Sequence, residues 1–251
     1  MSFINSPLEL VPTSRGDGNK NVIITGASKG LGKAIAEKFA AAGHRLILCS
    51  RNEKTLQATQ QELSQRYSNK NIEISATDIS KKENAIAFGN FCLQHATPGI
   101  LINNAGSFLP GTIHTEKDGV FETMMKTNLN SAYHVTRTVL PAMMESKSGH
   151  IFNMCSIASL AAYKNGGSYS ISKFALLGFS KNLREELKPY NIKVTAVIPG
   201  AVYTDSWSGS GINPERIMQV DDVANMVYAA SLLSPQACVE DIIMRPQLGD
   251  L

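Results

Sequence analysis

The 251-residue sequence has no apolar run that approaches the roughly 20 residues needed to cross a bilayer. It also lacks a strong charge of either sign, because 24 Lys and Arg residues oppose 21 Asp and Glu residues. No dense Lys/Arg run accompanies the net charge of +3, so a nucleic-acid partner is not expected. Hydrophobic residues make up 43% of the chain, which excludes a disordered protein and predicts a soluble globular one.

Cysteine is scarce as well. Cys49, Cys92, Cys155 and Cys238 lie far apart, with neither a C-x-x-C pair nor a metal-ligand spacing among them. They could form two disulfides, but a chain of this length does not need them to fold. Residues 1–11 lack the basic start and the continuous apolar stretch of a secretion signal. We therefore expect a cytoplasmic protein without a bound metal ion.

Short apolar runs alternate with helical patterns along most of the chain. Residues 1–19 are expected to form a flexible arm, and residues 20–251 a single domain. The predicted strands cover residues 22–25, 45–50, 72–77, 100–103, 150–155, 193–198 and 242–244. The predicted helices cover residues 31–42, 52–67, 81–95, 118–145, 168–189 and 221–233. This alternation predicts an α/β fold, a Rossmann-type doubly wound parallel sheet of about seven strands with helices on both faces.

A glycine-rich turn, Thr25-Gly26-Ala27-Ser28-Lys29-Gly30-Leu31-Gly32, joins the first predicted strand to the first helix. Glycines allow a tight turn and a close approach of the backbone to a pyrophosphate, and the helix N-terminus supplies N–H donors. The spacing G-x-x-x-G-x-G differs from the standard G-x-G-x-x-G, and such a turn alone could be purely structural. Its place after the first strand of a long βα series predicts a dinucleotide site.

The end of the second predicted strand indicates which dinucleotide is bound. NAD sites carry Asp or Glu about 20 residues past the glycines, whereas this strand ends in Ser50-Arg51 without a carboxylate. The planar guanidinium of Arg51, with Ser50 and Lys29 as further donors, suits a ribose 2′-phosphate. Arg51 could instead be a solvated loop residue. We predict NADP(H) as the cofactor.

Two further loops are expected at the same edge, because ligands of open α/β sheets bind at the carboxyl ends of the strands. Asp78 and Ile79 follow the third strand, and Asp78 either accepts from the adenine or, like Ser80, caps the next helix. Asn103-Asn104-Ala105-Gly106 ends the fourth strand. Its small residues would let the chain pass close to the cofactor.

Tyr169 and Lys173 are four residues apart on a predicted helix, so their side chains share one face. A carbonyl that receives hydride develops oxyanion character and needs a proton donor beside it. A phenol can be that donor, and a neighbouring ammonium favours its ionised form. Ser156 follows the fifth strand; it could belong to the site or be a cap, with Ser159 the active serine. Cys155 is expected to be a buried thiol, because no histidine base is placed for it.

These motifs together resemble the short-chain dehydrogenase/reductase family. The matching motifs, in the family's order and spacing over roughly residues 20–245, are the glycine turn from Thr25 to Gly32, Asn103 to Gly106, Ser156, Tyr169-x-x-x-Lys173 and Pro199-Gly200. Lys29 and Arg51 agree with the family's basic residues in its NADP users. The resemblance implies the predicted fold and an oxidoreductase activity.

The resemblance also implies a role for each site residue. Tyr169 would be the general acid, Ser156 would bond the substrate carbonyl, and Lys173 would hold the nicotinamide ribose and tune Tyr169. Asn128 would anchor a proton-relay water, although it could also tie its helix backbone to a neighbouring strand. The segment Pro199-Gly200-Ala201-Val202-Tyr203-Thr204 would wrap the nicotinamide end of the cofactor.

The segment from Ala201 to Met218 is expected to close over the substrate as a lid. Tyr163 and Trp207 are the candidate walls of the substrate pocket, although Trp207 could instead pin the lid to the body. The sequence around Trp207 and the C-terminal ending from Glu240 resemble bacterial sepiapterin reductases, which reduce the side-chain ketone of a pterin.

We therefore predict an NADPH-dependent carbonyl reductase that acts on a small ketone, with a pterin of the sepiapterin type as one candidate. A 3-oxoacyl thioester reductase is the alternative enzyme, and a catalytically silent NADP(H)-binding sensor is the alternative without turnover. The family resemblance also implies a homodimer or homotetramer that pairs the helices predicted over residues 118–145 and 168–189.

Overall fold

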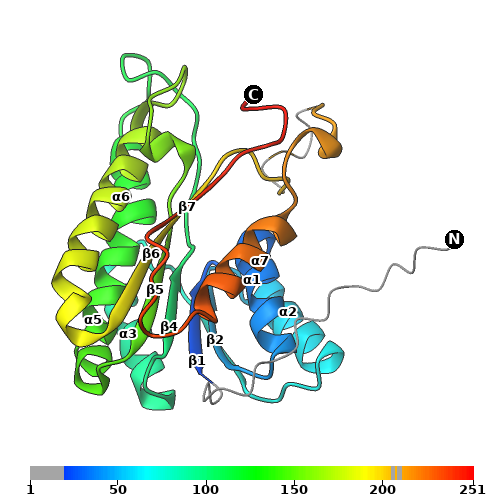
Figure 1. Cartoon of the computed structure of the whole chain (residues 1–251). Coiled ribbons are helices and arrows are strands. Elements are labelled where there is room, and N and C mark those ends of the chain that lie inside the picture. The colour runs from blue at the N-terminus through cyan, green and yellow to red at the C-terminus, as the bar shows by residue number, and fades with distance from the viewer. Residues whose placement is uncertain (1–19, 205–206, 208–210) are drawn as a thin grey trace, which may run out of the picture.

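The computed structural model describes residues 20–204, 207 and 211–251, so the arm predicted over residues 1–19 and part of the predicted lid lie outside it. Seven parallel strands form one sheet in the order β3-β2-β1-β4-β5-β6-β7 (Figure 1). The strands are β1 (Asn21–Thr25), β2 (Arg45–Ser50), β3 (Ile72–Ala76), β4 (Ile100–Asn103), β5 (Gly149–Met154), β6 (Ile192–Pro199) and β7 (Asp241–Met244). The predicted parallel, Rossmann-type sheet is confirmed.

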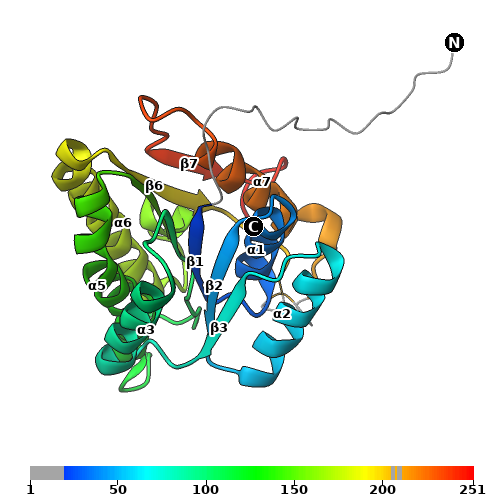
Figure 2. The same ribbon diagram turned by 90° about the horizontal axis from the view of Figure 1, so that it is seen from below.

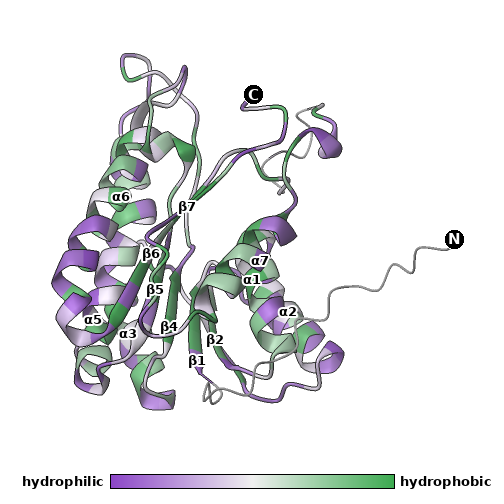
Figure 3. Ribbon diagram, in the orientation of Figure 1, coloured by the Kyte–Doolittle hydropathy of each residue, from purple (hydrophilic) through white to green (hydrophobic). Residues whose placement is uncertain are grey.

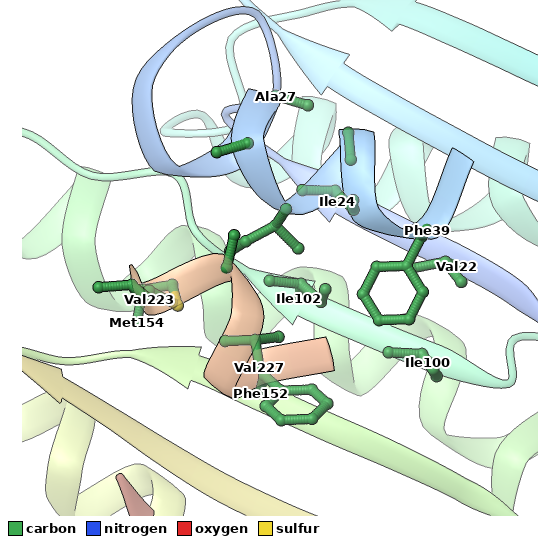
Figure 4. Close-up of a cluster of buried hydrophobic side chains, with 14 of the residues drawn as sticks. Val22, Ile24, Ala27, Phe39, Ile100, Ile102, Phe152, Met154, Val223 and Val227 are labelled. Atoms are coloured by element: carbon green, nitrogen blue, oxygen red, sulfur yellow. The ribbon is translucent and has the colours of Figure 1, made fainter. Parts of the chain in front are cut away.

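Helices cover both faces of this sheet (Figure 2). One layer holds α1 (Gly30–Ala41), α2 (Glu53–Arg66) and α7 (Val220–Ser231), and the other holds α3 (Lys82–His95), α5 (Ser131–Ser146) and α6 (Gly167–Leu187). Successive strand residues point to opposite layers, so Val22 and Ile24 pack against α1 while Ile23 packs on the other side (Figure 4). The central strands are buried on both faces, which is why they are mostly apolar, while polar residues lie along the outer helices (Figure 3).

The region predicted as one helix over residues 118–145 consists of three consecutive elements. The short α4 (Val120–Met125) continues into a π-helical turn (Lys126–Asn130), and α5 follows it. A π-helical turn widens the backbone by one residue, a feature often found at functional sites. It places Asn128, with 1% of its surface exposed, in the interior next to the loop after β4. The predicted long helical region is therefore present, but it contains a π-helical turn that the sequence pattern did not predict.

The strand order reverses between β1 and β4. From this point, the sheet extends through β2 and β3 in one direction and through β5, β6 and β7 in the other. In open α/β sheets, this switch point opens a crevice at the carboxyl ends of the strands. The turn after β1 and the loop after β4 meet there. Within the described residues, none of the helices combines the length and apolar character that a transmembrane helix requires.

Candidate active site

The glycine turn after β1 is locked to the loop after β4. The Thr25 hydroxyl accepts hydrogen bonds from the backbone N–H groups of Asn104 and Ala105, at 3.0 and 2.9 Å. In return, the Asn104 side-chain amide donates to the carbonyls of Thr25 and Gly26, at 2.9 and 3.0 Å. The motifs that begin at Thr25 and at Asn103 therefore form one rigid unit, in which the Asn104 amide holds the turn itself.

Gly32 leaves no room for a side chain in this unit. A Cβ atom there would lie 2.3 Å from the Gly26 carbonyl oxygen and 2.5 Å from the Asn104 amide nitrogen. Among the described residues, no side-chain hydrogen bond caps the N-terminus of α1, which begins at Gly30. The first N–H groups of a helix have no partner within it and attract anions. The turn therefore fits the pyrophosphate of a dinucleotide.

Polar and basic residues lie at the end of β2, next to the turn. The Ser50 hydroxyl donates to the Ser28 hydroxyl at 2.8 Å, and Thr59 donates to the Ser28 carbonyl at 3.1 Å. Lys29 and Arg51 are both exposed there. The structure thus brings the predicted donors for a 2′-phosphate together, and no carboxylate follows directly at this strand end.

Asp78 forms a turn after β3. Its carboxylate accepts from the N–H and hydroxyl groups of Ser80, at 3.2 and 2.7 Å. Burial opposes the charge, but these hydrogen bonds and the charges of Arg51 and Lys81 outweigh it and lower the pKa of Asp78. Neither Asp78 nor Ser80 caps α3, whose N-cap residue Lys81 has no side-chain cap, so the helix-cap alternative is wrong. The adenine contact of Asp78 stays a prediction.

Two predicted cofactor residues have apolar side chains that pack into the protein. Ile79 is buried in the core beside α3, and Leu31 packs against the core beside α1.

Tyr169 and Lys173 lie on the first turns of α6. The Lys173 ammonium is 5.7 Å from the centroid of the Tyr169 ring and donates to the Met154 carbonyl at 2.7 Å. A Cβ atom on Gly106 would lie 3.7 Å from the same ammonium. Because Gly106 belongs to the loop locked to the glycine turn, the structure brings the predicted chemical and cofactor residues to one place. Lys173 is only 7% exposed.

Ser156 and Ser159 have different positions after β5. Ser156 caps a short 3₁₀ turn (Ile157–Ser159), and its side chain accepts from the Ala158 N–H at 3.2 Å. Ser159 is 1% exposed and its side chain accepts from the Ser156 N–H at 3.2 Å. Ser159 is therefore a structural residue. Ser156 is a cap, as one of the two alternatives predicted. It also lies just after the end of β5, where the Lys173 ammonium donates to the Met154 carbonyl.

Asn128 connects the π-helical turn to two other elements. Its side chain accepts from the Ser107 N–H at 2.8 Å and donates to the Ser107 carbonyl at 3.0 Å and to the Ser172 hydroxyl at 2.9 Å. Ser172 in turn donates to the Tyr169 carbonyl at 2.7 Å. The side chain of Asn128 thus fixes the loop after β4 and the turn of α6 that carries Tyr169. Its role in a proton relay stays a prediction.

Cys155 is a buried thiol, as expected. Burial raises the pKa of Cys155 to about 11, and the nearby charge of Lys173 offsets this only in part. The thiol is therefore protonated near neutral pH and is not a nucleophile. All four cysteines of the chain are free.

The segment after β6 reaches the glycine turn from the other side. Pro199 ends β6, and the Gly200 N–H donates to the Met244 carbonyl at 2.8 Å. Val202 forms a bridge with Met218. A Cβ atom on Gly30 would lie 3.5 Å from the Thr204 methyl carbon. Gly30, predicted to bind the pyrophosphate, and Thr204, predicted to lie at the nicotinamide end, are therefore neighbours.

The two predicted substrate residues have different surroundings. Tyr163 borders a cavity of about 430 Å³ whose lining includes Ile113 and Phe174. Partial burial and the neighbouring phenol of Tyr169 raise the pKa of Tyr163 to about 12, so the two phenols are close. Trp207 is half-buried, and its backbone N–H donates to the Thr204 carbonyl at 2.9 Å. Residues 205–206 and 208–210, beside Trp207, lie outside the described chain.

Three residues contribute to the site without having been predicted to do so. The sequence did indicate a role for Thr25, because a hydroxyl residue that ends an apolar strand lies at the edge of the sheet. Phe108 packs edge-on against Tyr169, with 4.8 Å between the ring centroids. Glu116 binds the residue before Tyr169. The last two lie in the irregular loop after β4, where no periodicity indicates their partners.

A parallel doubly wound sheet, a glycine turn locked to the loop after β4, and Ser156, Tyr169 and Lys173 at the same edge define a Rossmann-type protein with an enzyme-like site. The family model for short chain dehydrogenases matches residues 20–213. The chain belongs to the short-chain dehydrogenase family, so the resemblance and the oxidoreductase class that it implied are confirmed.

Three similar proteins illustrate the range of this family. A sepiapterin reductase from Chlorobaculum tepidum is 32% identical over 92% of this chain and 97% of its own. A metagenomic short-chain oxidoreductase, solved in complex with NADP, is 30% identical with a TM-score of 0.79, over 92% of this chain and 98% of its own. A beta-ketoacyl-ACP reductase from Bacteroides thetaiotaomicron is 31% identical with a TM-score of 0.80, over 92% and 98% of the two chains.

Proposed function

We propose that this oxidoreductase is an NADPH-dependent carbonyl reductase that acts on a small ketone. The observation that carries the proposal is the placement of Lys173 beside Gly106, because Gly106 belongs to the loop locked to the glycine turn. A proton donor and a dinucleotide cradle therefore share one edge of the sheet. The similar metagenomic oxidoreductase with NADP supports the cofactor part of the proposal.

The residues present fit NADP(H). The N-terminus of α1 and the close backbone approach at Gly32 would hold the pyrophosphate. Ser50 and the exposed guanidinium of Arg51 would hold the 2′-phosphate, and Lys29 would add a third donor. Gly200 and Thr204 would lie along the nicotinamide half. When bound, the reduced nicotinamide supplies the hydride.

The chain itself supplies the proton and the orientation. Tyr169 would hold a proton on its phenol oxygen and give it to the developing oxyanion, while the Ser156 hydroxyl donates to the same oxygen. The Lys173 ammonium is fixed to the Met154 carbonyl and lies 5.7 Å from the centroid of the Tyr169 ring, on the same helix. Phe108 and the Asn128–Ser172 pair hold the ring and the backbone of Tyr169 in place.

The substrate class has two candidates. The 32% identity to the Chlorobaculum sepiapterin reductase favours a pterin side-chain ketone. The similarity to the Bacteroides enzyme keeps a 3-oxoacyl thioester as the alternative.

The proposal is tested by following NADPH oxidation with sepiapterin, with small diketones and with acetoacetyl thioesters. We expect turnover with at least one of them, and more efficiently with NADPH than with NADH. Tight NADPH binding without turnover on any substrate of the panel would instead support the catalytically silent sensor.

Replacing Arg51 by alanine should weaken NADPH binding about 10- to 100-fold and leave NADH binding unchanged. Charge-assisted hydrogen bonds contribute about 1.5–3 kcal/mol, which corresponds to that range. Titration of cofactor fluorescence would measure both dissociation constants. The control is Lys54→Ala, which removes an exposed positive charge three residues further along. Equal NADPH affinity in Arg51→Ala and the wild type would contradict the assignment of the 2′-phosphate site.

A homodimer or homotetramer is also part of the proposal. Tyr133 on α5 and Ile171 and Phe174 on α6 are exposed apolar residues, each about 40% or more accessible. A second copy that covered them would bury apolar surface on the two helices that the sequence predicted for the interface. Sedimentation would detect it, and a 27.1 kDa monomer would contradict it.

A further inference from the structure

Glu116 lies in the loop between β4 and α4 and binds the first turn of α6. One carboxylate oxygen accepts from the Ser168 N–H at 2.9 Å, and the other accepts from the Ser168 hydroxyl. Ser168 directly precedes Tyr169 and is 2% exposed. The first N–H groups of a helix need partners outside it, and a carboxylate there also interacts favourably with the helix dipole. The N-cap residue of α6 is Gly166, which has no side chain to do this.

Two glycines form the site that Glu116 occupies. Gly167 has a φ of +38°, and a Cβ atom there would lie 2.1 Å from a Glu116 carboxylate oxygen. A Cβ atom on Gly111 would lie 2.9 Å from the Glu116 Cγ. The Gly111 N–H also donates to the Asn165 carbonyl at 3.1 Å. The loops that precede α4 and α6 are thus joined around this carboxylate, and a larger residue at either glycine would displace it.

The same loop contacts Tyr169 itself. Phe108, eight residues before Glu116, packs edge-on against the phenol ring with 4.8 Å between centroids. The segments that follow β4 and β5 extend together beyond the sheet at the top of Figure 1. Tyr169 is therefore held through its ring by Phe108 and through the preceding residue by Glu116.

We infer that Glu116 is a positioning residue for Tyr169, and this inference rests on the proposed function. Its carboxylate fixes the first turn of α6 and so sets the position of the phenol relative to Ser156 and Lys173. Glu116 lies 52 residues before Ser168 in the sequence. Through this contact, the loop after β4 helps to position the proton donor on α6.

The expected effect follows from the sensitivity of proton transfer to position. A misplacement of about 1 Å can lower the rate about 100-fold. We therefore expect Glu116→Ala to lower kcat, measured at saturating NADPH, about 10- to 100-fold. The KM for NADPH should change less than about twofold. Glu116 makes no contact with the glycine turn among the interactions of the described residues, so cofactor affinity should remain.

Glu116→Gln provides a gentler variant, because the amide keeps one oxygen that can accept from the Ser168 N–H. It should lose less kcat than Glu116→Ala. Glu122→Gln, the same change at an exposed position of α4, should behave as the wild type. In a double-mutant cycle, Ser168→Ala should add less to the loss of Glu116→Ala than it causes alone, since both changes remove the same hydrogen bond.

A second measurement uses the protein without cofactor. Hydrogen exchange of a peptide covering residues 166–173 should be faster in Glu116→Ala than in Glu122→Ala, because the Ser168 N–H loses its acceptor. If the wild-type protein showed no turnover, only the proposed function would be overturned. The hydrogen-exchange measurement would still test the contact between Glu116 and Ser168. An unchanged kcat at saturating NADPH in Glu116→Ala, or unchanged hydrogen exchange in the same variant, would overturn the inference.

Discussion

Tyr169→Phe is expected to lower kcat about 100- to 10,000-fold, the range by which a positioned acid or base accelerates proton transfer. The substitution removes only the phenol oxygen. The ring keeps its edge-on contact with Phe108, and the Ser172 hydrogen bond goes to the main chain, so α6 should remain in place. The reduction of a ketone, followed by NADPH absorbance, would measure the loss. NADPH affinity should change little, because the glycine turn is untouched.

Tyr163→Phe is the matched control for this prediction. Its phenol is close to that of Tyr169 and is also partly buried, but it does not lie beside Lys173 among the described contacts. We expect Tyr163→Phe to change the KM for the ketone more than kcat, because Tyr163 is predicted to be a wall of the substrate pocket and not the proton donor. If Tyr163→Phe abolished turnover and Tyr169→Phe did not, the proton donor would have been assigned to the wrong phenol.

The strands were predictable because a parallel sheet buried on both faces needs apolar residues at every position. Val22 and Ile24 belong to one core cluster and Ile23 to the other, so both faces of the strand need apolar side chains. The π-helical turn was not predictable. An i→i+5 turn and an i→i+4 turn leave nearly the same pattern of apolar residues over residues 118–145, and the buried Asn128 became informative only once its partners were known.

The site was predictable to the extent that strand order alone determines it. The carboxyl ends of parallel strands meet at one edge, so Ser50, Asn104 and Ser156 were expected there from their positions after strands. The contacts between these loops could not be predicted in the same way. The Asn104 amide bonds a carbonyl 78 residues away, and Glu116 caps a helix 52 residues further on. Such contacts depend on side-chain direction and distance, which no local pattern records.

Gly32→Ala is expected to weaken NADPH binding about 100-fold or more. The added Cβ atom would lie 2.3 Å from the Gly26 carbonyl oxygen, which is backbone and cannot rotate away. Either α1 must shift or the hydrogen bonds of Asn104 must break, and both change the positions of the N–H groups that would hold the pyrophosphate. Overpacking of this kind typically also lowers the free energy of unfolding by about 1–3 kcal/mol. Cofactor titration and thermal unfolding would measure the two effects separately.

Gly178→Ala on α6 is the control, because it makes the same chemical change where space allows it. No atom lies within 4 Å of the added Cβ at Gly178, which is an exposed helical position. An alanine there should raise the free energy of unfolding by about 0.5–1 kcal/mol through helix propensity and leave NADPH binding unchanged. A loss of affinity confined to Gly32→Ala would therefore reflect the geometry of the turn and not the loss of a glycine as such. Wild-type affinity in Gly32→Ala would show that the pyrophosphate lies elsewhere, and the cofactor site assigned to this turn would be wrong.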